Sequence, residues 1–421
     1  MMNHLLNEEQ FPAGFLPAWF EARHRQALEH VKEHFFRDLP SRRMESWRFG
    51  TPGNESLENF EAAPPVAPEA LASIIREHAS MPDAIRIVYA NGLPVSIPEE
   101  LPEGLAVMDL EDFVLQYPDA ARKHLETAPE TLGSEKLAAL NTALQHNGLV
   151  IMADREISCP LEIFHFISGD NVAVFPATLV IAETGSRLHI LERHVSADHG
   201  SQFCGALQQH HLSSASSVKY ALVQELNSRS RAVELCHIMA DDSAEMEHLV
   251  SHPGAAWARQ ETVCLLNGDS ANVRLLSASH LKENKELDQR TYQKHLYRGA
   301  SSNLLYVNVL DDEASSIFSG MILVAEGAHD TSAYQSNRNL SLSPRAEANS
   351  IPGLEILADR VQCSHGSATS SISPEEIFYL LSRGIPEHTA RRMIAQGFLK
   401  HALDQFSDET LRAAVEEIVL S

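Results

Sequence analysis

Between residues 149 and 370 the chain repeats one short unit many times. Short alternating or apolar runs are separated by turn-forming clusters, and small residues recur with a nearly fixed spacing. Ser216, Ser230, Ala244 and Ala258 lie 14 residues apart, Ala271 follows after 13, and Ala300, Ala314 and Ala328 are again 14 apart. A chain that forms a strand and a corner about every 14 residues can coil into stacked parallel strands, with small residues at the tight corners. The spacing predicts a parallel β-solenoid.

A β-sandwich is the main alternative, because it also contains many short strands separated by turn clusters. A sandwich needs no fixed period, however, whereas a solenoid does. We therefore favour a mainly β protein with a solenoid core over residues 148–372.

Helical segments are expected on both sides of this core. Residues 17–36 carry apolar residues at helical spacing, and residues 137–146 form a short helix that ends at Asn147-Gly148. Between them, residues 84–90 alternate and meet the turn signal Asn91-Gly92, which predicts a small hairpin. Residues 1–147 thus form a helical and mixed N-terminal domain.

Residues 373–421 are expected to form a helical C-terminal domain. Ser373-Pro-Glu-Glu376 is a capping box, with Ser at the N-cap, Pro at the first helical position and Glu at the third. Pro386 can open a second helix that runs to about Phe406, and Ser407 can cap a third that ends near Leu420. Three short helices have too little core of their own, so they should pack on the solenoid, on each other or on another protein.

Composition excludes some classes of function. With 421 residues the chain is too long for one ordinary core, and its formal charge of −24 disfavours nucleic acids and anionic membrane surfaces as partners. No apolar run approaches the length of a membrane span, and the first ten residues lack the pattern of a secretory signal. We therefore expect a cytoplasmic protein.

The cysteines and most of the histidines offer little chemistry by their spacing. Five cysteines without a CxxC pair argue against a disulfide framework and a structural zinc site, and we expect all except Cys363 to be small buried hydrophobes. His248 and His252 lack the Glu of a zinc-protease helix, and His210 and His211 form an isolated pair. These histidines are interpreted as surface or hydrogen-bonded residues. Neither a P-loop nor a GxSxG elbow is present in the sequence.

Cys363 and His365 are the exception. Two residues apart on a strand, they share one face with backbones roughly 7 Å apart, and thiolate and imidazole both bind iron, iron–sulfur clusters and zinc. Two ligands do not complete a site. Either a second chain or a distant strand supplies the others, or Cys363 is a buried thiol beside a hydrogen-bonded His365.

The first C-terminal helix is apolar on nearly every side, around Phe378, Tyr379, Leu380, Leu381 and Ile385. It can dock on the solenoid, or it can serve a partner, with Arg383 and Gly384 at the rim of the contact. The sequence leaves both readings open.

Several segments resemble the SufD group of the SufB/SufD family, scaffold subunits of the Suf machinery for iron–sulfur cluster assembly. The strongest matches are residues 331–343, 348–359, 363–366 and 378–385, and weaker matches are residues 43–48, 88–92 and 139–143. Where SufB members typically have Glu-His-Glu, this chain has Ser364-His365-Gly366. That difference favours the SufD group.

The resemblance implies a right-handed parallel β-helix between helical terminal domains. It implies pairing with a SufB-like homologue through the β-helix and docking of a SufC-like ABC-type ATPase on the C-terminal helices. His365 would lie at the subunit interface as a candidate cluster ligand, with Cys363 beside it. The ATPase-docking segment would comprise Ile377, Phe378, Tyr379, Leu380, Leu381, Ser382, Arg383, Gly384 and Ile385.

A non-catalytic scaffold is accordingly the leading hypothesis. We expect no tightly bound cofactor in the isolated chain, a transient iron–sulfur cluster in the complex, and a homodimer when the chain is alone; participation of a flavin stays open. One alternative is a β-helix enzyme that acts on acidic polysaccharide, which the negative charge disfavours. The other is a homodimeric interaction module in which Cys363 and His365 are structural.

Overall fold

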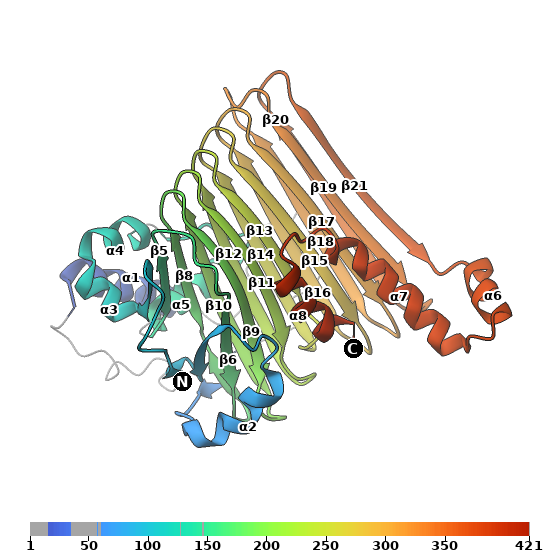
Figure 1. Ribbon diagram of the computed structural model, residues 1–421, viewed down its shortest axis with the longest axis horizontal. Helices are drawn as coiled ribbons and strands as arrows, with labels where there is room; N and C mark the ends of the chain where they lie inside the picture. Colours follow the sequence, from blue (N-terminus) through green and yellow to red (C-terminus); the bar gives the residue numbers. More distant parts are fainter. Residues whose placement is uncertain (1–15, 35–56, 58–59, 127, 145–146, 421) are drawn as a thin grey trace.

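The computed structural model describes residues 16–34, 57, 60–126, 128–144 and 147–420. Its centre is a stack of strands that wind into a parallel β-helix with two long sheets (Figure 1). One sheet consists, in spatial order, of β20 (Glu347–Ile356), β18 (Ser315–Val324), β16 (Glu286–His295), β14 (Trp257–Leu266), β12 (Arg231–Ala240), β10 (Gln202–Leu212), β8 (Ala177–Ala182), β5 (Leu149–Ala153) and β4 (Leu105–Asp109), with β7 (Val172–Val174) beside β10 and β1 (Glu61–Ala62) beside β7.

The second sheet faces the first and takes the intervening strands. It consists of β21 (Gln362–Ser371), β19 (Ser332–Ser341), β17 (Ser301–Leu310), β15 (Asn272–Leu281), β13 (Glu245–Ser251), β11 (Ser217–Glu225), β9 (Arg187–Ser196), β6 (Leu161–Ile167), β2 (Ile85–Ala90) and β3 (Leu93–Ser96). Successive strands of the stack alternate between the sheets, so the predicted parallel solenoid is confirmed and the sandwich alternative is wrong.

The sequence repeat corresponds to half a turn of the helix. Ser217 pairs with Glu245 and Asn272 pairs with Ser301, so a full turn spans two of the 14-residue units. The corners explain the small residues. Ser243, Ser270 and Gly299 have positive φ angles of 53°, 59° and 65°, and each is followed by a fully buried alanine. The chain turns sharply at the first residue, and a larger side chain at the second would collide with the layer above.

Inside the helix, equivalent residues of successive turns stack on one another. Leu188, Val218, Met246 and Val273 are register partners from β9 to β15, and all are buried. Such ladders bury the inner face of every layer except the last, which has a neighbour on one side only.

Helices close the N-terminal end. α1 (Ala18–His34) and α5 (Glu135–Leu144) pack together, and α5 packs on β10 of the first sheet, where Leu137 and Leu140 belong to the same buried cluster as Phe203 and Leu207. The remaining helices here are α2 (Pro68–His78), α3 (Leu110–Gln116) and α4 (Pro118–Leu125). The expected helices and hairpin are present, although residues 35–36, 43–48 and 145–146 of the predicted segments lie outside the described residues.

Two of the three C-terminal helices, α7 (Glu387–Leu403) and α8 (Glu409–Val419), lie on the second sheet. α6 (Pro374–Ser382) begins at the predicted capping box, in which the Ser373 hydroxyl accepts from the Glu376 amide. α7 and α8 bury Leu399 and Leu411 against the outer face of the sheet, at Leu249 and Leu276. The cap of α8 is Asp408 rather than the expected Ser407, because the Asp408 carboxylate accepts from the Leu411 amide at 2.9 Å. No described helix has the length and apolarity that a membrane span requires.

Several buried histidines make folding depend on pH. Burial lowers the pKa of both His237 and His295 to about 4, from 6.5 in the unfolded chain. Because the unfolded state takes up protons first, this contribution to stability is complete above pH 6.5 and is lost as the pH falls towards 4. By the linkage relation each histidine accounts for about 3 kcal/mol across that window.

We therefore predict that the free energy of unfolding, measured in urea from pH 8 to pH 4, falls steeply below pH 6.5. His295→Gln removes one titrating group and should make the decline shallower by about 1–3 kcal/mol. A surface variant, His199→Gln, is the matched control and should follow the wild-type curve. If H295Q and the wild type decline in parallel, His295 does not titrate as its burial requires.

Candidate functional site

The predicted ligand pair lies on β21, the last strand of the stack. Cys363 pairs with Ala333 and His365 with Gln335, and both of these β19 residues are buried. Cys363 and His365 therefore occupy the inward-facing row of the final turn, as the two-residue spacing predicted. No described strand lies beyond β21, so His365 is exposed and Cys363 is half-buried against the apolar residues below it. Partial burial raises the pKa of the Cys363 thiol.

The open end presents two unpaired strand edges. Among the described strands, β20 pairs only with β18 and β21 pairs only with β19, and each is ten residues long. β21 reads QCSHGSATSS and carries no charged residue. Proteins usually protect long edge strands with charges, bulges or covering segments, because an unprotected edge pairs readily with another chain. The absence of such protection marks this edge as a surface for strand pairing.

α6 projects away from the β-helix and contacts α7 (Figure 1). None of its residues is buried; Phe378, Tyr379 and Leu381 are 71%, 57% and 42% exposed, and Ile377 and Leu380 are half-buried. Gly384, with φ +80°, ends the helix, and the Arg383 guanidinium lies 5.3 Å from the centre of the Tyr379 ring. The helix thus leaves most of its apolar surface uncovered rather than docking fully on the solenoid.

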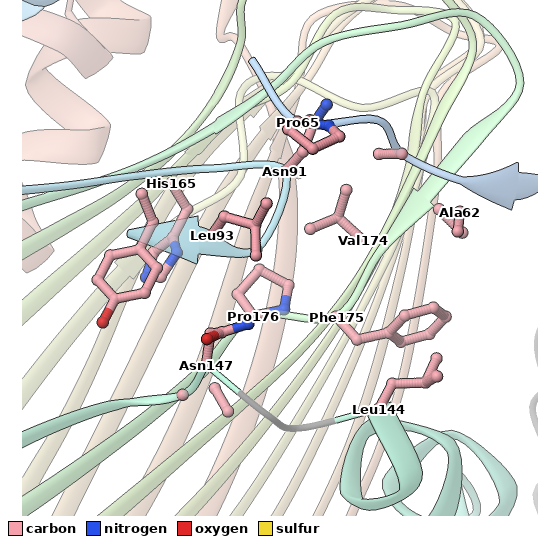
Figure 2. Close-up of a pocket in the computed structure, with 16 residues that line it drawn as sticks. Ala62, Pro65, Asn91, Leu93, Leu144, Asn147, His165, Val174, Phe175 and Pro176 are labelled. Atoms are coloured by element: carbon pink, nitrogen blue, oxygen red, sulfur yellow. The ribbon is translucent and has the colours of Figure 1, made fainter. Parts of the chain in front are cut away.

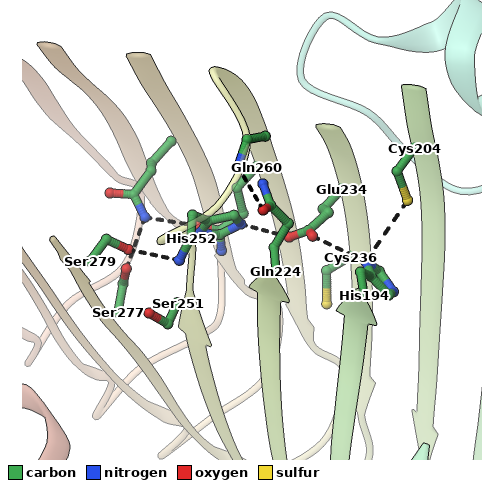
Figure 3. Close-up of polar contacts among 12 residues, drawn as sticks. His194, Cys204, Gln224, Glu234, Cys236, Ser251, His252, Gln260, Ser277 and Ser279 are labelled. Atoms are coloured by element: carbon green, nitrogen blue, oxygen red, sulfur yellow. Dashed lines mark hydrogen bonds and ion pairs between the residues drawn. The ribbon is translucent and has the colours of Figure 1, made fainter. Parts of the chain in front are cut away.

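Part of the interior of the first turns is polar, which the sequence analysis missed. His194 lies between two carboxylates, 2.9 Å from Glu192 and 3.2 Å from Glu234, and Figure 3 shows Glu234 and Cys204 beside it. Burial opposes protonation of His194, but Cys204 and the two carboxylates raise its pKa well above the usual value. Although burial also opposes ionisation of Glu192, its histidine neighbours lower the pKa of that carboxyl to about 2. This centre is a buried ion network.

His210, His248 and His252 are buried in the same region, so their interpretation as surface residues is wrong. His252 is hydrogen-bonded to Glu234, as the alternative allowed, but neither ring nitrogen of His210 has a hydrogen-bond partner in the described part of the chain. Cys204, Cys236 and Cys264 are buried as expected, whereas Cys159 is half-exposed. Only the register of the paired strands shows that these residues lie close together, and that register cannot be derived from the sequence alone.

A pocket of about 400 Å³ opens next to this interior, between the β2–β3 turn and the segment that leads into β8 (Figure 2). Its lining is both polar and apolar, with Val174, Phe175 and Pro176 on one side and His165 on the other (Figure 2), and Tyr89 is also among the lining residues. His165 Nε2 is 3.5 Å from Glu192, so the pocket meets the buried ion network.

Comparisons with known proteins agree with these features. The family described as "SUF system FeS cluster assembly, SufBD core domain" matches residues 165–398, which include most of the β-helix, its open end and α6. The iron–sulfur cluster assembly protein SufD of Escherichia coli is 27% identical over 402 residues, covering 93% of this chain and 90% of the relative.

SufD of Bacillus subtilis is 23% identical over 417 residues, covering 96% of this chain and 94% of the relative. SufB of the same organism is 23% identical over 302 residues, covering 71% of this chain and 64% of that relative. With the family match over more than half of its length, the chain belongs to the SufB/SufD family of iron–sulfur cluster assembly proteins.

Proposed function

We propose that this chain is a non-catalytic scaffold subunit that pairs with a SufB-like homologue through the edges of β20 and β21. The observation that carries the proposal is the last turn of the β-helix, where an uncharged ten-residue edge strand holds an exposed His365 beside a half-buried Cys363. A partner strand along this edge would continue the sheet and bring its own side chains to the same inner row.

Cys363 and His365 are too few to complete a metal site, and an incomplete ligand set suits a site that holds a cluster only temporarily. Cys363 and His365 offer one thiol and one imidazole to iron or to an iron–sulfur cluster, which here is cargo rather than a resident cofactor. Ligands from the partner would complete the set only while the two chains are paired. A cluster held across an interface can be released when the interface distorts, whereas a site made by one chain holds its metal more permanently.

The exposed face of α6 is proposed as the docking surface for a SufC-like ATPase. Phe378 and Tyr379 are large aromatic residues, of the kind that dominates the binding energy of protein interfaces, and Arg383 lies at their rim. α6 touches the rest of the molecule mainly through α7, so a force applied to it would act on α7 and α8 and then on the second sheet. Movement of the ATPase would thereby reach the sheet that ends in β21.

A homodimer formed through the same edges is the second candidate. The unprotected edge of β21 favours it, because a second copy of this chain could pair there when no homologue is present. The family match points to cluster assembly and so disfavours the polysaccharide enzyme.

His365→Ala should leave the complex intact but impair cluster formation. The complex is obtained by co-expression with SufB-like and SufC-like proteins, and the cluster is measured by iron content and visible absorption after reconstitution. We expect cluster content to fall several-fold, because one ligand is removed from an exposed position that contributes little to folding. Ser364→Ala, on the adjacent outward-facing position, is the control. Unchanged cluster content in H365A would remove His365 from the ligand set.

Phe378→Ser should strongly weaken docking of the ATPase without affecting the β-helix. An exposed aromatic anchor at an interface centre is worth about 2 kcal/mol or more, so binding should weaken at least about 30-fold. Binding is measured by titration with the purified ATPase, and thermal unfolding reports the fold. Leu115→Ser is the matched control, since Leu115 is 52% exposed on α3, far from α6 in sequence. Equal binding by F378S and L115S would contradict the proposed docking surface.

Point substitutions are a sharper test than deletion of the C-terminal helices. Leu399, Leu403 and Leu411 are buried with the outer face of the second sheet, so deletion would uncover a large apolar surface. A loss of docking in such a truncation would then report damage to the fold as much as loss of the site.

A further inference from the structure

Three side chains meet inside the β-helix, and their hydrogen bonding is incomplete. His210 on β10, Cys236 on β12 and His248 on β13 are buried, and their ligand atoms all lie within 4.8 Å of one another. They come from both sheets, so the winding of the chain rather than a local motif brings them together. They lie on a different part of the β-helix from Cys363 and His365, which occupy the last turn.

The hydrogen bonding of these residues is unfinished. A neutral imidazole has one donor and one acceptor nitrogen, and burial without partners is costly for both. Among the described residues, both ring nitrogens of His210 lack a hydrogen-bond partner, and so does Nδ1 of His248. The remaining nitrogen of His248, Nε2, faces Cys236 Sγ at 3.7 Å. The fully buried His210 therefore places one of its two unpartnered nitrogens within 4.8 Å of the Cys236 thiol and of a ring nitrogen of His248.

The separation of the sulfur and nitrogen atoms fits a shared metal ion. Zinc binds sulfur at about 2.3 Å and imidazole nitrogen at about 2.0–2.1 Å, so tetrahedral geometry places the two ligand atoms about 3.6 Å apart. A set of one thiolate and two imidazoles suits Zn²⁺, Fe²⁺ or Co²⁺ and is poor for Mg²⁺ or Ca²⁺, which prefer oxygen.

Tyr220 holds the two rings in position. Its ring packs edge-on against His210, with centroids 4.5 Å apart, and stacks on His248, with centroids 5.6 Å apart. Its hydroxyl donates to Glu192, which fixes the ring in turn. Supporting contacts of this kind orient the ligands in protein metal sites.

The neighbouring group of His165, Glu192 and His194 is a weaker candidate. Its carboxylate already accepts hydrogen bonds from His194 and Tyr220, and both ring nitrogens of His194 already face carboxylates, Nε2 at Glu192 and Nδ1 at Glu234, so they are not available to a metal. His165 lines the pocket and approaches Glu192, so this group lies between the pocket and the interior.

We infer that His210, Cys236 and His248 form a binding site for one divalent transition-metal ion, Zn²⁺ or Fe²⁺, inside the β-helix. Three protein ligands leave a fourth coordination position for water or another small ligand. The site belongs to this chain alone, so it needs neither the partner subunit nor the ligand pair of the last turn.

Cobalt is a suitable probe, because Co²⁺ accepts the same ligands and a Co²⁺–thiolate bond gives a charge-transfer absorption in the near ultraviolet. The full chain, purified alone and treated with a chelator, is titrated with Co²⁺. We expect one equivalent to bind with this absorption, Zn²⁺ to displace it, and Mg²⁺ to leave it unchanged. Fe²⁺, added without oxygen, should compete if the site accepts iron, and Zn²⁺ alone should compete if it is a zinc site.

Cys236→Ser should remove the charge-transfer absorption, and His210→Gln and His248→Gln should each weaken Co²⁺ binding at least tenfold. Cys264→Ser changes another buried thiol, one outside the group, and should retain the signal. Thermal unfolding checks the fold of every variant. Should C236S fail to fold, the two histidine variants and a Zn²⁺-dependent rise in the melting temperature of the wild type still test the site.

Cys363→Ser separates this inference from the proposed function. If the cobalt signal is lost in C363S but kept in C236S, the metal binds at the last turn, and the interior site is refuted while the scaffold proposal stands. Absence of a thiolate signal in the wild type, or equal loss in C264S and C236S, would also overturn the interior site. Retention of the signal in C363S together with its loss in C236S is the expected result.

Discussion

Parallel pairing between successive turns is the interaction on which this molecule depends. Each turn satisfies its backbone and buries its inner face only through the turns above and below it, as in the ladder from Leu188 to Val273. At the N-terminal end, α1, α3, α5 and the β2–β3 hairpin pack around the first turns. At the other end nothing described covers β20 and β21. The proposed cluster site and pairing surface are thus direct consequences of a stack that stops without a cap.

The sequence revealed the architecture but not its pitch. Small residues such as Ala244 and Ala271 recur because every corner needs one, so their spacing counts corners. Each turn has two corners, and only the strand pairing shows that two units make one turn. Local signals were dependable where the physics is local, as at the Ser373 capping box and the Asn91-Gly92 turn. At α8, two adjacent polar residues could cap, and the carboxylate of Asp408 does so.

The candidate site shows the same division. Cys363 and His365 were recognisable because two residues on one strand share a face whatever the surroundings. The sequence could not show the group of His210, Cys236 and His248, because these residues come from two different sheets. Their separations of 26 and 12 residues carry no structural information until the strand register is known. The same limit hid the ion network around His194, whose members come from three turns. Long-range convergence is a property of winding, and it appears only once the turns are aligned.

The uniform stacking also has an evolutionary consequence. Neighbouring strands in a sheet are about 4.8 Å apart, so inserting or deleting one complete turn would move the last turn by about that amount relative to the first. The helices of the N-terminal end and the edge at β20 and β21 would each keep their own contacts. Relatives of different length can therefore vary in discrete steps, provided that the turns that join His210 to His248 stay intact.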